Sequence, residues 1–179
     1  MNQDKILLFQ IIAILFSIIL GTLLHFTYNW SGKNKIVGIF SAVNESTWEH
    51  LKLTFFPILL FSIVEYCFLK DISQNYLIAK FIALIVSISF IVIFFYTYTG
   101  ILGKNYFILD ITSFILAIIF SEIIAYQIMI LPEVSNSNLN NLVAIGIGIL
   151  LFFFVIFTFF PPKIQLFQDS ITKEYGIKS

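Results

Sequence analysis

The stretch AVNESTWEHLK, residues 42–52, gathers two carboxylates, an imidazole and an amide between two very apolar segments. Imidazoles and carboxylates are the side chains that most often bind divalent metal ions and transfer protons in proteins. A stretch of this kind beside apolar segments therefore indicates a polar site at the end of a membrane helix bundle. Its candidate site residues are Asn44, Glu45, Glu49 and His50.

Local structure alone explains part of this stretch. Ser46 and Glu49 have the S-x-x-E spacing of a capping box, in which both side chains satisfy amide groups at a helix N-terminus. Glu49 can also pair with Lys52 near the headgroups. Glu45 has only Lys52 as a local partner and His50 has none, so we expect Glu45 and His50 to bind a ligand rather than only to cap a helix.

Four further ionisable residues lie within apolar segments, where a charge is costly unless it is paired or faces a wet cavity. His25 and Asp110 are expected at the same membrane face as the polar stretch. Glu65 and Glu122 are expected in the opposite half of the membrane, at similar depth on neighbouring helices. Two facing carboxylates would share a proton or bind a cation. Alternatively, each is protonated and hydrogen-bonded to Ser, Tyr or backbone groups.

The composition sets the class of protein that must position these groups. Apolar residues make up 59% of the chain and charged residues 11%, which predicts an integral membrane protein. Its ten lysines and ten acids give no net charge, and the absence of arginine argues against a nucleic acid as partner. The expected partners are the lipid bilayer and either a second copy or another membrane protein.

Five apolar stretches reach the length of about 20 residues that a helix needs to cross a bilayer. They are residues 6–26, 51–69, 77–99, 107–131 and 142–160. Residues 36–43 are apolar but too short to cross, which predicts an interfacial or re-entrant segment. The predicted fold is an all-α, polytopic membrane helix bundle that forms one domain over residues 1–179.

The lysines predict the orientation of these five segments. Seven lysines lie on one side and three on the other, counting Lys80 just inside a helix. Cytoplasmic loops are enriched in lysine, so we expect the N-terminus outside the cell membrane and residues 161–179 in the cytoplasm. That tail alternates apolar and polar residues after Pro161 and Pro162, which predicts an ordered cover over the polar site.

Three stretches, LLHFTYNWSG, GIFSAVNESTWEHLKLTFFP and FPPKIQLFQDSITKEYGI, are similar to a family of small bacterial multi-pass membrane proteins catalogued as a domain of unknown function. The resemblance runs nearly from end to end. It implies a bacterial membrane protein and supplies no activity, cofactor or site residue.

The function that fits these features best is binding or transport of a small polar or cationic solute at the cytoplasmic site, with the two deeper acids extending a proton or ion path outward. One alternative is an intramembrane metal-dependent hydrolase or transferase that acts on a lipid, although no H-E-x-x-H or G-x-S-x-G motif is present. Others are a haem bound by His25 and His50, and an accessory membrane subunit. The sequence leaves open which metal or cofactor, if any, is bound.

Overall fold

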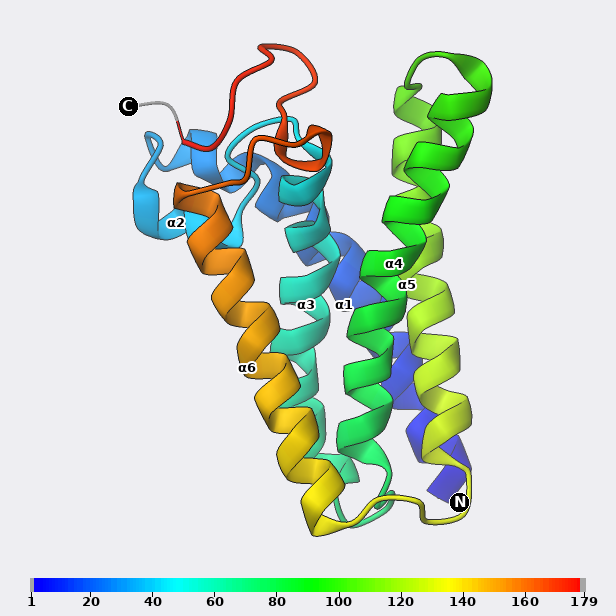
Figure 1. The fold of residues 1–179 in the computed structure, drawn as a ribbon. Helices are drawn as coiled ribbons and strands as arrows, with labels where there is room; N and C mark the ends of the chain where they lie inside the picture. Colours follow the sequence, from blue (N-terminus) through cyan, green and yellow to red (C-terminus); the bar gives the residue numbers. More distant parts are fainter. Residues whose placement is uncertain (1, 178–179) are drawn as a thin grey trace.

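The fold is a bundle of long helices, seen in a computed structural model that describes residues 2–177 (Figure 1). The helices are α1 (Asn2–Trp30), α2 (Lys35–Phe40), α3 (Thr47–Leu69), α4 (Tyr76–Leu102), α5 (Phe107–Met129), α6 (Ser137–Phe159) and the 3-10 helix η1 (Gln165–Phe167). All but α2 and η1 are long and apolar enough to cross a membrane. The predicted all-α fold with five spans is confirmed, and the chain is a multi-pass membrane protein.

Polar capping residues set helix boundaries that apolar length alone does not show. The Ser46 hydroxyl accepts a hydrogen bond from the Glu49 amide at 3.3 Å, so α3 begins four residues before the apolar stretch. The Asn136 side chain accepts from the Leu139 amide at 3.0 Å and starts α6 five residues early in the same way. α5 ends at Met129, two residues before the predicted end.

The helices alternate in direction, so their ends gather at two faces of the bundle (Figure 1). We call one face the tail end: it holds the last turns of α1, α4 and α6, the first turns of α3 and α5, helix α2 and residues 160–177. The N-terminus lies at the opposite end. α1 packs along α3 and α4 packs along α5, while α6 contacts α4. The packing of α1 on α3 positions the candidate site.

The short helix α2 lies at the tail end and does not cross the bundle, as its six residues require (Figure 1). Its first turn is capped by Asn34, whose side chain accepts from the Ile36 amide at 2.8 Å. The Ser41 hydroxyl that follows α2 accepts from the Tyr28 amide at 2.9 Å and donates to the Leu24 carbonyl. These bonds anchor the polar stretch beside the last turns of α1.

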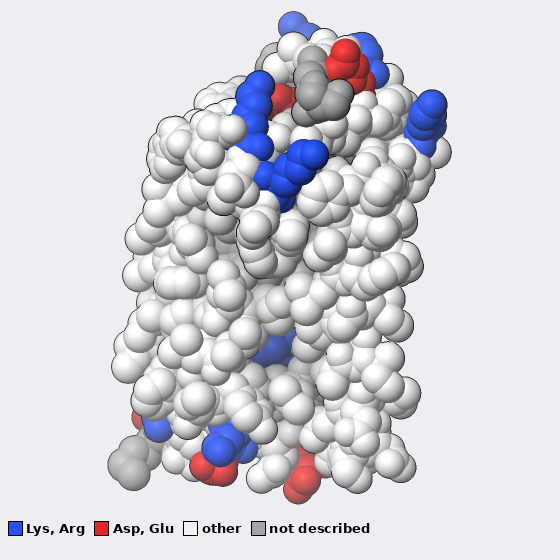
Figure 2. Space-filling view, turned by 90° about the vertical axis from the view of Figure 1, so that its left-hand side faces the viewer, with Lys and Arg blue, Asp and Glu red and all other residues white. Residues whose placement is uncertain are grey.

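Charged and apolar side chains are distributed over the surface as a bilayer requires. Figure 2 shows charged side chains gathered at the two ends, with a broad uncharged belt between them that one small blue patch interrupts. Large apolar side chains such as Ile19, Ile63 and Ile93 are exposed along the helices. Because lipid tails replace water around such a belt, exposed apolar residues are expected there.

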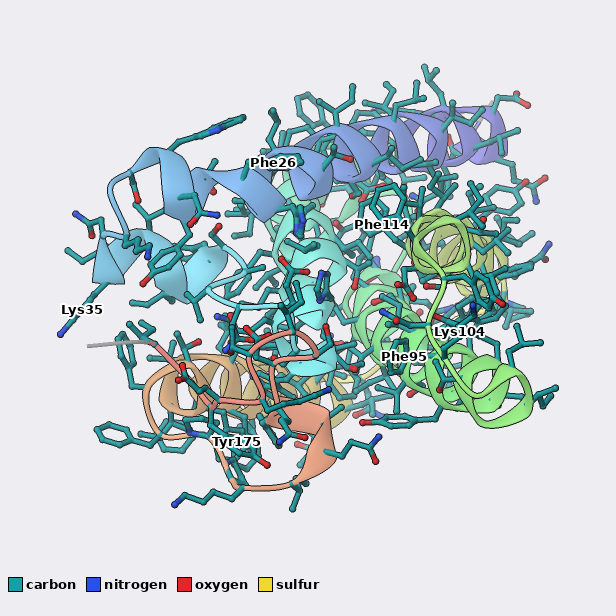
Figure 3. All side chains as sticks on the ribbon, turned by 90° about the horizontal axis from the view of Figure 1, so that it is seen from above. Phe26, Lys35, Phe95, Lys104, Phe114 and Tyr175 are labelled. Atoms are coloured by element: carbon teal, nitrogen blue, oxygen red, sulfur yellow. The ribbon has the colours of Figure 1, made fainter. Side chains whose placement is uncertain are left out.

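The tail folds back over the polar stretch. The Phe167 ring lies 4.8 Å from the Trp48 ring between centroids, and the Asn44 amide donates to the Gly176 carbonyl at 3.1 Å. Seen from above, the segment with Tyr175 crosses the end of α6 beside α3, whereas the loop with Lys104 lies apart (Figure 3). The tail thus lies where the sequence predicts a cover.

Candidate metal-binding site

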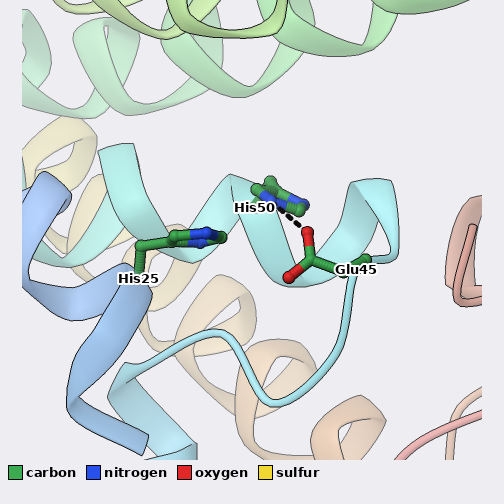
Figure 4. A group of neighbouring side chains, drawn as sticks. All are labelled: His25, Glu45 and His50. Atoms are coloured by element: carbon green, nitrogen blue, oxygen red, sulfur yellow. Dashed lines mark ion pairs between the residues drawn. The ribbon is translucent and has the colours of Figure 1, made fainter. Parts of the chain in front are cut away.

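Three side chains from three segments meet at the tail end. His25 comes from α1, Glu45 from the loop before α3 and His50 from the first turn of α3 (Figure 4). One nitrogen or oxygen atom of each lies within 4.8 Å of the corresponding atoms of the other two. No other group of three or more His, Cys, Asp or Glu residues approaches so closely within residues 2–177.

The backbone of α3 fixes the ring of His50. Its Nδ1 lies 2.8 Å from the Ser46 carbonyl oxygen and must donate to it, because a carbonyl only accepts. Nε2 is then the ring nitrogen left to face a ligand; without a metal ion it donates a proton to the Glu45 carboxylate, and a bound ion would replace that proton. Nε2 lies 3.4 Å from the Glu45 carboxylate. Two ligand atoms of a tetrahedral zinc ion stand about 3.3 Å apart, so this pair already has the required spacing.

The tail holds the backbone of Glu45. The Glu45 amide donates to the Asp169 carboxylate at 3.4 Å, and the Glu45 carbonyl accepts from the Ser170 amide at 3.3 Å. The hydrogen bond with His50 lowers the pKa of Glu45, against the opposing effect of partial burial. Glu45 is therefore an anion at neutral pH, the form in which a carboxylate binds a metal ion.

His25 completes the group from α1. Its ring centroid lies 5.3 Å from that of His50, with 34° between the ring planes. Its Nδ1 is buried and has no hydrogen-bond partner within residues 2–177. Buried ring nitrogens in proteins usually have a partner. A ligand bound between the two imidazoles and the carboxylate is one way to supply it.

Glu49 lies outside this group and has a structural role. Its carboxylate pairs with Lys52 at 2.6 Å and accepts from the Val43 amide at 3.0 Å, and both charged side chains are buried. Lys52 also donates to the Gly38 carbonyl at 2.9 Å. Only half of the predicted capping box forms, because the Glu49 carboxylate binds the Val43 amide rather than that of Ser46.

Asn44 and Asp110 also lie outside the group of three. Asn44 holds the tail through Gly176 and accepts from the Ser46 amide at 3.0 Å. Asp110 accepts a short hydrogen bond from the Tyr98 hydroxyl and so links α5 to α4. Of the six candidate residues at this end, three form one possible ligand set.

The two deeper acids face a common space, and a lysine lies between them. The Lys80 ammonium is 2.7 Å from the Glu65 carboxylate and 2.6 Å from that of Glu122. From the sequence, Lys80 is predicted only as a lysine just inside a helix, and its contact with the two acids is not predicted. The signal was available, since a lysine within an apolar span needs a buried counter-ion.

Two cavities lie beside the group of three. A polar cavity of about 210 Å³ opens between α1 and the tail, with Tyr28, Asn44 and Asp169 in its wall. An apolar groove runs between α1 and α2, lined by Trp30 and Phe40. Neither is lined by His25, Glu45 or His50.

The chain belongs to DUF6512, a family of unknown function, which matches residues 1–177. The predicted resemblance to a domain-of-unknown-function family is thereby confirmed. No curated protein and no solved structure shows a significant match to the chain.

Proposed function

We propose that this protein binds a divalent transition-metal ion through His25, Glu45 and His50 at the tail end of the bundle. The observation that carries the proposal is the approach of one ligand atom from each residue to within 4.8 Å of the others. The hydrogen bond from His50 to the Ser46 carbonyl supports it, because metal-binding histidines almost always donate their second ring nitrogen in this way.

The ligand types select the class of ion. Two imidazoles and one carboxylate suit zinc, iron, cobalt or nickel, whereas magnesium and calcium prefer sites made entirely of oxygen. Three protein ligands leave a fourth position open for water or an exchangeable ligand. Such an open position suits a site that loads and releases its ion.

Metal binding or transport fits this site better than the alternatives. A metal-dependent lipid hydrolase would need a substrate cleft at the open position, whereas the polar cavity and the apolar groove described above are lined by other residues. A haem between His25 and His50 would need the space beside the His50 Nε2 that the Glu45 carboxylate occupies. A cation carrier needs only the ion site and a route along the bundle.

The proposal also includes the orientation of the chain in the membrane and the kind of membrane in which it lies. Seven lysines lie at the tail end and three at the opposite end. Without the buried Lys52 and Lys80 the counts are six and two, so the tail end still has the excess of lysine. The tail end and its metal site then lie on the cytoplasmic side of a bacterial cell membrane. Five spans in so short a chain favour assembly with a second copy or another membrane protein.

Zinc titration of the purified, chelator-treated protein tests the metal site directly. We expect one zinc ion per chain by calorimetry, loss of binding in His25→Ala and His50→Ala, and unchanged binding in the matched control Asp110→Asn. Excess magnesium should not compete with zinc. Zinc binding that survives both histidine substitutions, or its absence from the folded wild-type protein, would overturn the proposal.

A further inference from the structure

A second polar cluster lies in the other half of the bundle, formed by Gln10, Glu65, Lys80 and Glu122 from four different helices. Lys80 directs its ammonium at the Glu65 carboxylate, the Glu122 carboxylate and the Gln10 carbonyl, at 2.7, 2.6 and 3.0 Å. An ammonium has three donors, so Lys80 has none left. All four residues are buried.

The two acids of this cluster differ in their remaining bonds. Glu65 accepts from Lys80 with one oxygen and from the Gln10 amide with the other. The Tyr76 hydroxyl lies 3.2 Å from the first oxygen, but its one proton has a nearer acceptor in the Ser62 carbonyl at 2.6 Å. Both of its oxygens are satisfied, as an ionised carboxylate requires. The donors around Glu65 therefore suit an ionised carboxylate.

Glu122 has only one satisfied oxygen. Its Oε2 accepts from Lys80, whereas its Oε1 is buried and has no hydrogen-bond partner within residues 2–177. A bare carboxylate oxygen without a partner is among the most costly groups to place inside a membrane. A neutral carboxylic acid lowers that cost at the same position.

The charges of the cluster also require one proton. The groups that face Glu122 are the neutral Gln10 from α1, Glu65 from α3, and Lys80 and Tyr76 from α4. One ammonium balances one carboxylate, so two ionised acids would leave a buried negative charge. One further positive charge is needed to neutralise the cluster.

We propose that Glu122 is a membrane-embedded proton-binding site, whose Oε1 binds the one proton that neutralises the cluster of Glu65, Lys80 and Glu122. A proton needs only the single free oxygen that the cluster offers. A sodium ion would need several oxygen ligands, and those of Glu65 and Gln10 are already engaged. Buried acids of this kind form the proton relays of pumps and transporters. The inference does not depend on the metal site.

Infrared spectroscopy of the protein in lipid bilayers at neutral pH tests the proposal. The wild type should show the C=O stretch of one buried, protonated carboxylic acid, shifted by ¹³C-glutamate labelling. Glu122→Gln should lose this band and stay folded, because Gln resembles the neutral acid in shape and charge. The control Asp110→Asn should keep it. Lys80→Gln should roughly double the band, because both acids then lack a balancing charge.

Several results would overturn the assignment. One is a wild-type spectrum without a glutamate C=O band, and another is a band that Glu122→Gln leaves intact. A band that appears only after sodium is replaced by choline would show that the cluster binds sodium in place of a proton. If Glu122→Gln fails to fold, the ¹³C-glutamate shift in the wild type and the doubling in Lys80→Gln still decide whether the cluster binds one proton.

Discussion

The His50 imidazole shows how the backbone controls the chemistry of a single side chain. The His50 ring donates from Nδ1 to the carbonyl of Ser46, the capping residue four positions earlier, which also accepts from the His50 backbone amide at 3.3 Å. The bond from Nδ1 keeps a proton on that nitrogen and fixes the orientation of the ring. His50 therefore needs no further side chain to direct its Nε2 at Glu45.

Glu45 and Glu49 are four residues apart, and the same substitution should affect them differently. Glu45→Gln removes the anionic ligand and should weaken zinc binding by more than the roughly 10- to 100-fold typical for loss of an outer-shell partner. Its unfolding free energy should hardly change, since Glu45 is nearly half exposed. Calorimetry and denaturant unfolding measure the two quantities.

Glu49→Gln should show the opposite pattern. It leaves the buried Lys52 without its counter-charge and should lower the unfolding free energy by about 3 kcal/mol. Zinc affinity of the folded protein should remain near that of the wild type. Equal loss of affinity in both variants would place Glu49 in the metal site and contradict the structural role assigned to it.

At the scale of elements, α1, the loop before α3 and the first turn of α3 each supply one site residue, and the tail supports the site from outside. Tail order depends on apolar contacts, because each ordered residue costs about 1 kcal/mol or more in backbone entropy. Phe167 supplies the main contact through the rings of Trp48 and Phe157, at centroid distances of 4.8 and 5.2 Å. The tail is therefore close to the balance between docking and release.

Phe167→Ala should release the tail without unfolding the bundle. Loss of a buried phenylalanine costs about 3 to 5 kcal/mol, which exceeds the margin of so short a segment. Trypsin should then cleave after Lys163 and Lys173 much faster than in the wild type. Ile171→Ala is the matched control, because that side chain is 76% exposed and its loss should leave cleavage unchanged. Equal cleavage of the wild type and Phe167→Ala would exclude a docked tail.

The docked tail should also depend on pH through Asp169. Burial raises the pKa of Asp169. Hydrogen bonds from the amides of Thr172, Ile171 and Glu45 lower this pKa by a larger amount, so that it lies below its ordinary value. A lowered pKa in the folded state gives stability that is present above the unfolded value near 4 and lost as the pH falls through the folded value. Tail docking should weaken only in that acidic range.

Trp48 fluorescence in a Trp30→Phe background measures this dependence. The signal should stay constant near neutral pH and change as the pH falls below about 4. Asp169→Asn keeps an acceptor in the turn and should remove most of the change. A transition of the same size in Asp169→Asn would assign it to another group, such as Glu45.

For the whole molecule, apolar length predicted the five spans, because a helix in lipid must satisfy its own backbone and cover the hydrocarbon thickness. It also predicted which helix ends share a face. It could not predict which polar side chains touch. Lys80 and Glu122 are 42 residues apart and meet only through the rotation of α4 against α5, which apolar patterns in near-uniform helices do not specify. The same applies to His25 and His50.

The proposed orientation has its own test. Green fluorescent protein fused after Ser179 should fluoresce, and alkaline phosphatase at the same site should be inactive, because the tail is expected in the cytoplasm. The reverse pair of results would invert the topology. The close approach of His25, Glu45 and His50 would be unaffected, but the metal site would then face outward.

The central claim is that His25, Glu45 and His50 bind one transition-metal ion. X-ray absorption at the zinc edge of the zinc-loaded protein tests it most directly, because imidazole ligands give a characteristic outer-shell scattering. The spectrum should show two imidazoles and additional oxygen ligands at about 2.0–2.2 Å, and His25→Ala treated in the same way should hold no stoichiometric zinc. A first shell of oxygen alone, or stoichiometric zinc retained by His25→Ala, would contradict the site.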